Sequence, residues 1–260
     1  MSKIVTLSFF LAKALIMEKS SYLFAIMAVV IMVIALGLGS VDIGSRNKLF
    51  EDVLLTSQGY LLLIAAFFYA FMLVSRDRNL GLFVLPIANG VSRGQYLAAL
   101  MGAMVWVVGI LFVLFLITDI FFLIIVEDEV HGMLLWQIFL YFLASLLAAF
   151  LFIGIASYVT LTNAVLYVAA LFFIGNALDE LYLYAYQMQS DSWLQWTASF
   201  GYYLLPNFSL FDWQAQIVNR RDIPLYDSAV LPLLYFGIWT LFLYFIALAH
   251  FRKKAMILGY

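Results

Sequence analysis

Six long apolar runs, separated by short polar segments, dominate the pattern along the chain. They cover residues 22–39, 53–74, 96–118, 133–158, 162–178 and 229–249, and none of them contains Asp, Glu, Lys or Arg. A helix needs about 20 apolar residues to cross the hydrocarbon core of a bilayer. The runs show no two-residue alternation, which favours helices over the strands of a membrane barrel. The pattern predicts an all-α membrane protein with six transmembrane helices in a single domain of residues 1–260.

The composition supports a membrane protein. Of the 260 residues 67% are hydrophobic and 11% are charged, whereas soluble domains carry about 25% charged residues. The first run is expected to remain as a span, because no cleavage site of small residues follows it. The chain has no cysteine, so it offers neither a disulfide nor a thiolate metal site.

The basic residues predict the orientation of the spans. Nine of them flank one side: Lys3, Lys13, Lys19, Arg76, Arg78, Arg93, Arg252, Lys253 and Lys254. Four flank the other side: Arg46, Lys48, Arg220 and Arg221. Because cytoplasmic segments are enriched in Lys and Arg, both termini and residues 76–95 are expected in the cytoplasm. An even number of spans is consistent with a basic segment at both ends.

The spans offer little chemistry of their own. Most acidic residues, including Glu51, Asp52 and Asp119, are expected in outer segments between the spans. An ion-coupled carrier usually places charges inside the membrane, so the energy source is expected elsewhere. The chain contains no Gly-Lys dipeptide, which excludes a Walker phosphate-binding loop. His131 follows an acidic run at residues 127–129 that could ligate a cation, although a solvated loop is the favoured interpretation.

The third run carries a stripe of small residues. Ala98, Gly102 and Gly109 fall on one face of a helix, where small side chains permit close approach of another helix. The stripe fits a dimer contact and packing within the chain equally well.

The polar segments at both ends of the bundle have amphipathic patterns. Residues 1–21 combine lysines with apolar side chains, which fits either a helix lying in the membrane interface or a charged flank. Residues 179–227 are rich in Trp and Tyr, which prefer the headgroup level of a bilayer. Short helices resting on the outer leaflet, broken at Pro206, are therefore expected there; an interfacial anchor is favoured over a lipid or sugar site.

The loop of residues 76–95 is too apolar for an ordinary solvated loop and too short to span. Leu82, Phe83 and Leu85 would form an exposed apolar face, and such a patch indicates a partner. Ser92 is the expected N-cap of the next helix, and Arg93 is expected to lie at the lipid phosphates.

Several segments resemble type-2 ABC transporter permeases. The stretch "RDRNLGLFVLPIANGVSRGQYLAALMGA" is similar to the family's segment between the second and third spans. The stretches "YYLLPNFSLFDW" and "LYFIALAHFRKKAM" resemble the segments before and after the last span. Leu82 stands where the family has Thr, and Ala99 where it often has Lys. The outer motif is most similar to the subgroup of multicopper-enzyme maturation, which includes the permease for the copper sites of nitrous-oxide reductase.

The resemblance implies roles for three groups of residues. Residues 1–21 would be the family's elbow helix, and the stripe on the third span could serve a dimer. The loop would be a coupling helix that docks on a separate ATP-binding subunit, through Arg76, Asp77, Arg78, Leu82, Phe83, Leu85 and Arg93. The outer motif comprises Tyr202, Tyr203, Pro206, Asn207, Phe208, Phe211 and Asp212.

The expected function is therefore that of the membrane subunit of a bacterial ABC transporter in the cytoplasmic membrane. The resemblance implies a homodimer, export as the direction, and ATP and Mg²⁺ bound by the partner, with no cofactor in this chain, no metal site and no nucleic acid. The alternative is a membrane scaffold that recruits a cytoplasmic protein through residues 76–95 and transports nothing. An intramembrane enzyme is disfavoured, because no polar residues converge on a catalytic pattern.

Overall fold

The structure is a computed structural model that describes residues 3–39, 46–81, 84–126, 132–187, 192–219 and 229–257. These residues are helical, with no strand in the described ranges. The elements are α1 (Lys3–Ile16), α2 (Lys19–Gly39), α3 (Arg46–Leu80), α4 (Val84–Ala88), α5 (Arg93–Val126), α6 (Gly132–Ala156), α7 (Leu161–Gln187), α8 (Ser192–Leu204), η1 (Ser209–Phe211), α9 (Gln214–Val218) and α10 (Leu231–Ile257).

Six of these helices coincide with the six apolar runs. Among the described residues α3, α5, α6, α7 and α10 are each long and apolar enough to cross a membrane. A bent pair, made of α1 and the first part of α2 at an angle of 75°, provides the sixth candidate. The expectation of an all-helical fold is confirmed for the described residues, with five or six helices long and apolar enough to cross a membrane.

The bundle is built around α6. Within the described chain 78% of its apolar stretch is buried, against 17% for α10. Close approach of α3 to α6 depends on Gly59, where a Cβ would lie 3.0 Å from the Tyr141 ring. Outer helices expose apolar side chains such as Phe173 and Ile238. Helices with apolar residues on all sides are typical of a lipid environment.

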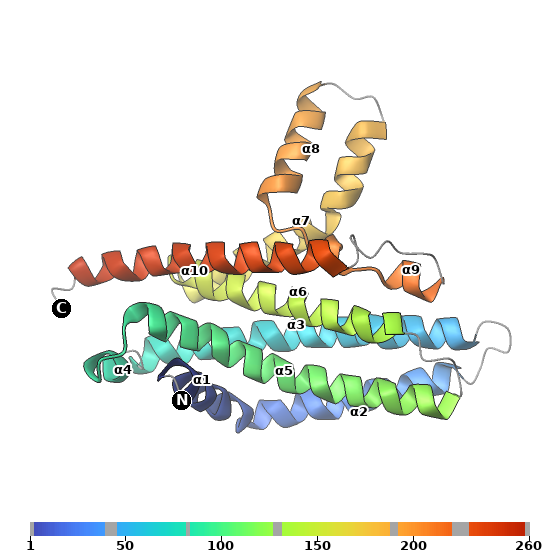
Figure 1. The fold of residues 1–260 in the computed structure, drawn as a ribbon, viewed down its shortest axis with the longest axis horizontal. Helices are drawn as coiled ribbons and strands as arrows, with labels where there is room; N and C mark the ends of the chain where they lie inside the picture. Colours follow the sequence, from blue (N-terminus) through green and yellow to red (C-terminus); the bar gives the residue numbers. More distant parts are fainter. Residues whose placement is uncertain are drawn as a thin grey trace.

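The two ends of the bundle carry different elements (Figure 1). At one end lie α1, α4 and the last turns of α10, while the starts of α3 and α6 lie at the other end together with α9. The described turn at α4 is thus at the same end of the bundle as α1 and the last turns of α10.

The second half of α7 leaves the bundle and pairs with α8 as a helical hairpin that projects sideways (Figure 1). Gly175 of α7 contacts the segment that follows α8. Its carbonyl oxygen accepts a hydrogen bond from the Phe208 N–H at 3.3 Å. α7 continues to Gln187 and is therefore longer than the fifth predicted run, residues 162–178.

The helix of the third predicted run is longer than residues 96–118. Asp119 lies inside α5, which continues to Val126, and its side chain is 4% exposed. Gln58 of α3 donates from Nε2 to Asp119 Oδ1 at 2.7 Å. This hydrogen bond between two apolar helices allows α5 to continue past a polar residue that the sequence pattern treats as an end.

Candidate functional site

Three consecutive residues at the end of α3 connect it to three other helices. Arg76 forms an ion pair with Glu18 and donates to the carbonyl of Ala14 at 3.4 Å, near the end of α1. Asp77 is buried and accepts a hydrogen bond from the Tyr96 hydroxyl of α5 at 2.5 Å. These two contacts attach the end of α3 to the first helix and to the third predicted span.

Arg78 makes the third connection. Its guanidinium donates to the carbonyl of Ala156, the last residue of α6, and to the carbonyl of Val159 at 2.8 Å. Carbonyl groups at the end of a helix lack partners within the helix, so a basic side chain stabilises them. The predicted coupling residues Arg76, Asp77 and Arg78 are therefore engaged within this chain.

The loop after α3 is formed by two tight turns around α4. Gly81 and Gly90 have positive φ angles of 58° and 75°, a conformation that glycine adopts without strain. The prediction of Ser92 as N-cap is confirmed, because Ser92 Oγ accepts from the Gln95 N–H at 3.2 Å. The Ser92 N–H in turn donates to Gln95 Oε1 at 2.9 Å, which completes a capping box.

The apolar face predicted for this loop falls mostly outside the described residues. Leu82 and Phe83 are not described, and neither is the side chain of Leu85. Their neighbours Leu80 and Val84 are 70% and 55% exposed. The described part of the loop thus presents apolar side chains to the surroundings.

Of the small residues in the third run, Gly102 has a role in packing within the chain. A Cβ at Gly102 would lie 3.1 Å from the Cβ of Ser8, so this glycine lets α1 pack closely on α5. A Cβ at Gly109 would lie 4.0 Å from the Phe142 ring of α6. Ala98 lines a small pocket together with Arg93.

At the other end of the bundle, Asn207 organises the segment between α8 and α9. It is 1% exposed and donates from Nδ2 to Asp179 Oδ1 of α7 at 3.0 Å. Its backbone N–H donates to the Tyr235 hydroxyl of α10 at 2.5 Å, and its Oδ1 accepts from the Ser209 N–H at 3.0 Å. One asparagine therefore joins α7, α10 and η1, next to Pro206 in the chain.

Gln137 was not predicted as a site residue. It attaches the same segment to α6. Its side chain is fully buried; Nε2 donates to the Phe211 carbonyl at 3.0 Å, and Oε1 accepts from the Trp213 N–H at 3.0 Å. Phe208 and Phe211 are 2% and 1% exposed. The expectation that these two aromatics rest on the outer leaflet is wrong, because they fill the space between α6, α7 and α10.

Other aromatics of the region are exposed on the α7–α8 hairpin. Tyr203 is 76% exposed, and Trp196 and Phe200 stack with ring centroids 5.5 Å apart on an exposed face. Tyr202 instead packs against Tyr182 of α7, with a centroid distance of 4.8 Å. Burial, and next the Asp179 carboxylate, raise the pKa of the Tyr202 phenol.

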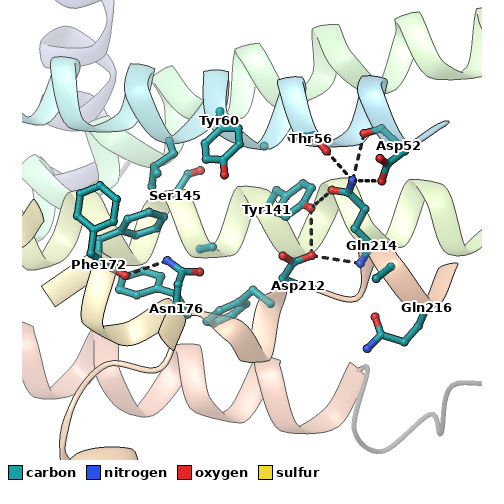
Figure 2. A pocket seen from close by; sticks show the side chains of 17 residues that line it. Asp52, Thr56, Tyr60, Tyr141, Ser145, Phe172, Asn176, Asp212, Gln214 and Gln216 are labelled. Carbon is teal, nitrogen blue, oxygen red and sulfur yellow. Dashed lines mark hydrogen bonds between the residues drawn. The ribbon is translucent and has the colours of Figure 1, made fainter. Parts of the chain in front are cut away.

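A cavity of about 520 Å³ lies on this end of the bundle (Figure 2). Its polar walls come from four elements: Asp52, Thr56 and Tyr60 of α3, Tyr141 and Ser145 of α6, Asn176 of α7, and Asp212, Gln214 and Gln216 around α9. Apolar walls are supplied by Leu63, Ala144, Phe172, Phe173, Phe208 and Phe211. A size of this order is typical of small-molecule sites.

Gln214 is the centre of a hydrogen-bond network in the cavity (Figure 2). Its Nε2 donates to Asp52 Oδ1 at 2.7 Å and to Thr56 Oγ1 at 2.5 Å. Its Oε1 accepts from the Tyr141 hydroxyl at 2.6 Å, which also contacts Asp212 Oδ1 at 3.2 Å. Isolated polar residues inside the apolar runs, such as Thr56 and Tyr141, were the only sequence signal for this site.

The acidic run at 127–129 and His131 lie outside the described residues. Within the described ranges no group of three or more His, Cys, Asp or Glu side chains could hold a metal ion. Comparisons with family models, curated proteins and solved structures gave no match to the chain.

Proposed function

We propose that the chain is the membrane-spanning permease subunit of an ABC transporter and that a separate subunit binds ATP and Mg²⁺. The proposal combines the resemblance of residues 76–103 to type-2 permeases with the contacts at the end of α3. It places the protein in a bacterial cytoplasmic membrane as a homodimer that exports its substrate, with α1, α4 and the end of α10 towards the cytoplasm.

The observation that carries the proposal is the set of contacts made by Arg76, Asp77 and Arg78. They attach the end of α3, directly before the loop, to α1, α5 and α6. A subunit that pushed on the loop would therefore act on four helices at once. Rigid-body movement of packed helices is a common way to transmit such a displacement, and it requires no charge transfer within the membrane.

The exposed side chains of the loop supply a contact surface for the ATP-binding subunit. Leu80 and Val84 are apolar and exposed at the turn between α3 and α4. In an apolar environment such residues need no partner, but beside two arginines and at the end of the bundle they are expected to face water. An exposed apolar patch in that position is typical of a protein contact.

The proposal is tested by purifying the tagged chain from its native membranes and identifying copurified subunits by mass spectrometry. We expect an ATP-binding subunit with a Walker loop, and we expect Leu80→Asp with Val84→Asp to remove it. The matched control is Met133→Asp, an exposed apolar residue at the other end of the bundle. Retention of the ATP-binding subunit by the double variant, or its absence from the wild-type sample, would contradict the proposal.

A non-transporting scaffold would use the same loop, so a second measurement separates the two functions. The purified complex is reconstituted into liposomes, and ATP hydrolysis is measured together with the movement of lipids and small molecules across the bilayer. A permease is expected to couple the two, whereas a scaffold bound to an ATPase would show hydrolysis with no movement.

A further inference from the structure

The cavity around Gln214 has an unusual balance of hydrogen-bonding groups. The donors of Gln214 are directed to Asp52 and Thr56 inside the protein, and the amide of Asn176 donates to the Phe172 carbonyl at 2.8 Å. The Tyr141 hydroxyl is likewise occupied by Gln214 and Asp212. The side-chain donors of Gln214, Asn176 and Tyr141 are thus engaged within the protein, whereas the Tyr60 and Ser145 hydroxyls and the Gln216 amide make no hydrogen bond to the described residues.

Two carboxylates of the cavity have an oxygen available to a ligand. Asp52 and Asp212 accept through Oδ1, while Oδ2 of each carboxylate accepts no hydrogen bond from the described part of the chain. Both residues are exposed at the cavity, where a molecule from outside can reach them. A ligand that donates hydrogen bonds would fit these oxygens, and one that only accepts would not.

The charged residues among the described walls of the cavity have one sign. They are Asp52 and Asp212, and no Lys, Arg or His is among the described lining residues. Like charges on a partly enclosed surface of low dielectric reinforce one another and concentrate ligands of opposite charge. Anionic headgroups and phosphates are therefore disfavoured at this site.

Aromatic rings complete the cavity. Tyr60 is 60% exposed and Phe173 is 74% exposed, so both offer ring surface that the protein leaves uncovered. Aromatic faces attract cations through their quadrupole and bury apolar groups. Two carboxylates beside uncovered rings are the features that recognise a positively charged group on an apolar body.

We propose that this cavity binds an organic cation, with an ammonium or guanidinium group at Asp52 and Asp212 and an apolar body against Tyr60 and Phe173. Binding itself requires only these residues. That the bound cation is a transported substrate rests on the permease function proposed above. The site lies at the end of the bundle opposite α4 (Figure 1), so such a cation would occupy the exit side of an exporter.

The experiment measures binding to the purified chain in nanodiscs of phosphatidylcholine, by equilibrium dialysis against phenylbutylamine. Phenylbutanol and phenylbutyrate have the same skeleton with a neutral and an anionic group, and empty nanodiscs correct for partition into lipid. We expect the amine to bind and the butyrate not to bind. Because no ATPase is present, a negative result would overturn this site without bearing on the proposed permease function.

Variants assign the binding to the cavity. Asp52→Asn and Asp212→Asn are each expected to weaken amine binding about tenfold, the loss of one charge-assisted hydrogen bond. The control is Glu180→Gln, which removes an exposed negative charge outside the cavity and should leave affinity unchanged. Equal binding of phenylbutanol and the amine, or wild-type affinity in both Asp→Asn variants, would overturn the proposal.

A second variant keeps the test informative if the Asp→Asn changes disturb folding. Tyr60 makes no hydrogen bond to the described residues, so Tyr60→Leu leaves the Gln214 network intact. It removes one aromatic face, and we expect about threefold weaker binding of the amine with little change for phenylbutanol. An equal effect on both ligands would indicate apolar binding alone and contradict recognition of the cation.

Discussion

Phe208 donates its backbone N–H to the carbonyl oxygen of Gly175 at 3.3 Å. The contact joins the segment after α8 to the middle of α7. A Cβ at position 175 would collide with the carbonyl oxygen of Pro206. A glycine is therefore required at this crossing for a steric reason.

Gly175→Ala is expected to lower the free energy of unfolding by about 1–3 kcal/mol, the usual cost of overpacking, because a backbone carbonyl cannot move aside as a flexible side chain can. The measurement is thermal unfolding in detergent, followed by circular dichroism. Gly237→Ala in α10 is the control, since no atom lies within 4 Å of its added Cβ. A variant at 175 as stable as the variant at 237 would contradict the close packing.

Gln137→Met is expected to destabilise the chain by about 2 kcal/mol. The change keeps the length of the side chain but leaves the Phe211 carbonyl and the Trp213 N–H buried without a partner. Stability in increasing denaturant measures the effect. Gln195→Met, at a partly exposed glutamine of α8, should change it little; equal effects at both positions would argue against the specific role of Gln137.

Arg78→Ala is expected to loosen the end of α6. The last carbonyls of that helix lose their guanidinium partner, so amide exchange in residues 153–159 should become about tenfold faster, a cost of about 1.4 kcal/mol. Hydrogen–deuterium exchange with mass spectrometry follows these amides. The control is Asn79→Ala, at an exposed neighbour whose side chain donates a hydrogen bond to Ser75 of its own helix.

The same arginine variant also tests the proposed coupling. If the loop transmits movement through Arg78, the Arg78→Ala complex should retain its ATP-binding subunit but lose most of its transport per ATP hydrolysed. Wild-type coupling in this variant, with the exchange rates changed as expected, would show that α6 does not receive the movement through Arg78.

Tyr202→Phe is expected to reduce the pH-dependent decrease in the free energy of unfolding at high pH. Burial, and second the Asp179 carboxylate, raise the pKa of Tyr202 above the ordinary 10.0. Above pH 10 the folded chain therefore keeps the phenol proton that the unfolded chain has released. The contribution of Tyr202 to the free energy of unfolding is complete below pH 10 and is lost as the pH rises through the pKa of the folded chain. Denaturant unfolding between neutral and strongly alkaline pH measures the slope.

Two matched variants assign that slope to Tyr202. Tyr203→Phe removes a hydroxyl from a side chain that is 76% exposed, and it should leave the slope as in the wild type. Asp179→Asn removes the neighbouring charge and should reduce the slope without abolishing it, because burial is the larger cause. A wild-type slope in Tyr202→Phe would contradict the assignment.

Leu80→Cys and Asn219→Cys are expected to react with a membrane-impermeant maleimide from opposite sides of the membrane. The chain has no cysteine of its own. Both side chains are exposed, and Leu80 precedes α4 whereas Asn219 follows α9, at the other end of the bundle (Figure 1). Labelling of intact cells should modify Asn219→Cys only, and labelling after lysis should modify both. Modification of Leu80→Cys in intact cells would reverse the predicted orientation.

The positions of the membrane helices follow from the sequence, but their lengths do not. Apolar runs mark the part of each helix that lipid or the core must surround, and charged residues were taken as ends. The helix α5 continues past Asp119, whose side chain accepts a hydrogen bond from Gln58, 61 positions earlier in the chain. Such a partner is set by tertiary packing and cannot be read from a local pattern.

In the candidate sites, a contact between residues close in the chain was predictable, whereas contacts between distant residues were not. The N-cap at Ser92 was predictable because its partner Gln95 is three residues away. Gln137 and Gln214 were missed because their partners lie more than 70 residues away in the chain. In both cases the available signal was a lone amide or hydroxyl in an apolar segment, a residue type that is costly there unless it is paired.

The three contacts at the end of α3 also limit how that helix can turn. Successive residues of a helix point about 100° apart, so Arg76, Asp77 and Arg78 reach their partners in three directions around one axis. A twist of α3 about this axis would stretch at least one of the three contacts, whereas a tilt that carries α1, α5 and α6 along would preserve them all. The motion of lowest energetic cost at this end of the protein is therefore a shared tilt, in which the four helices move as a rigid body.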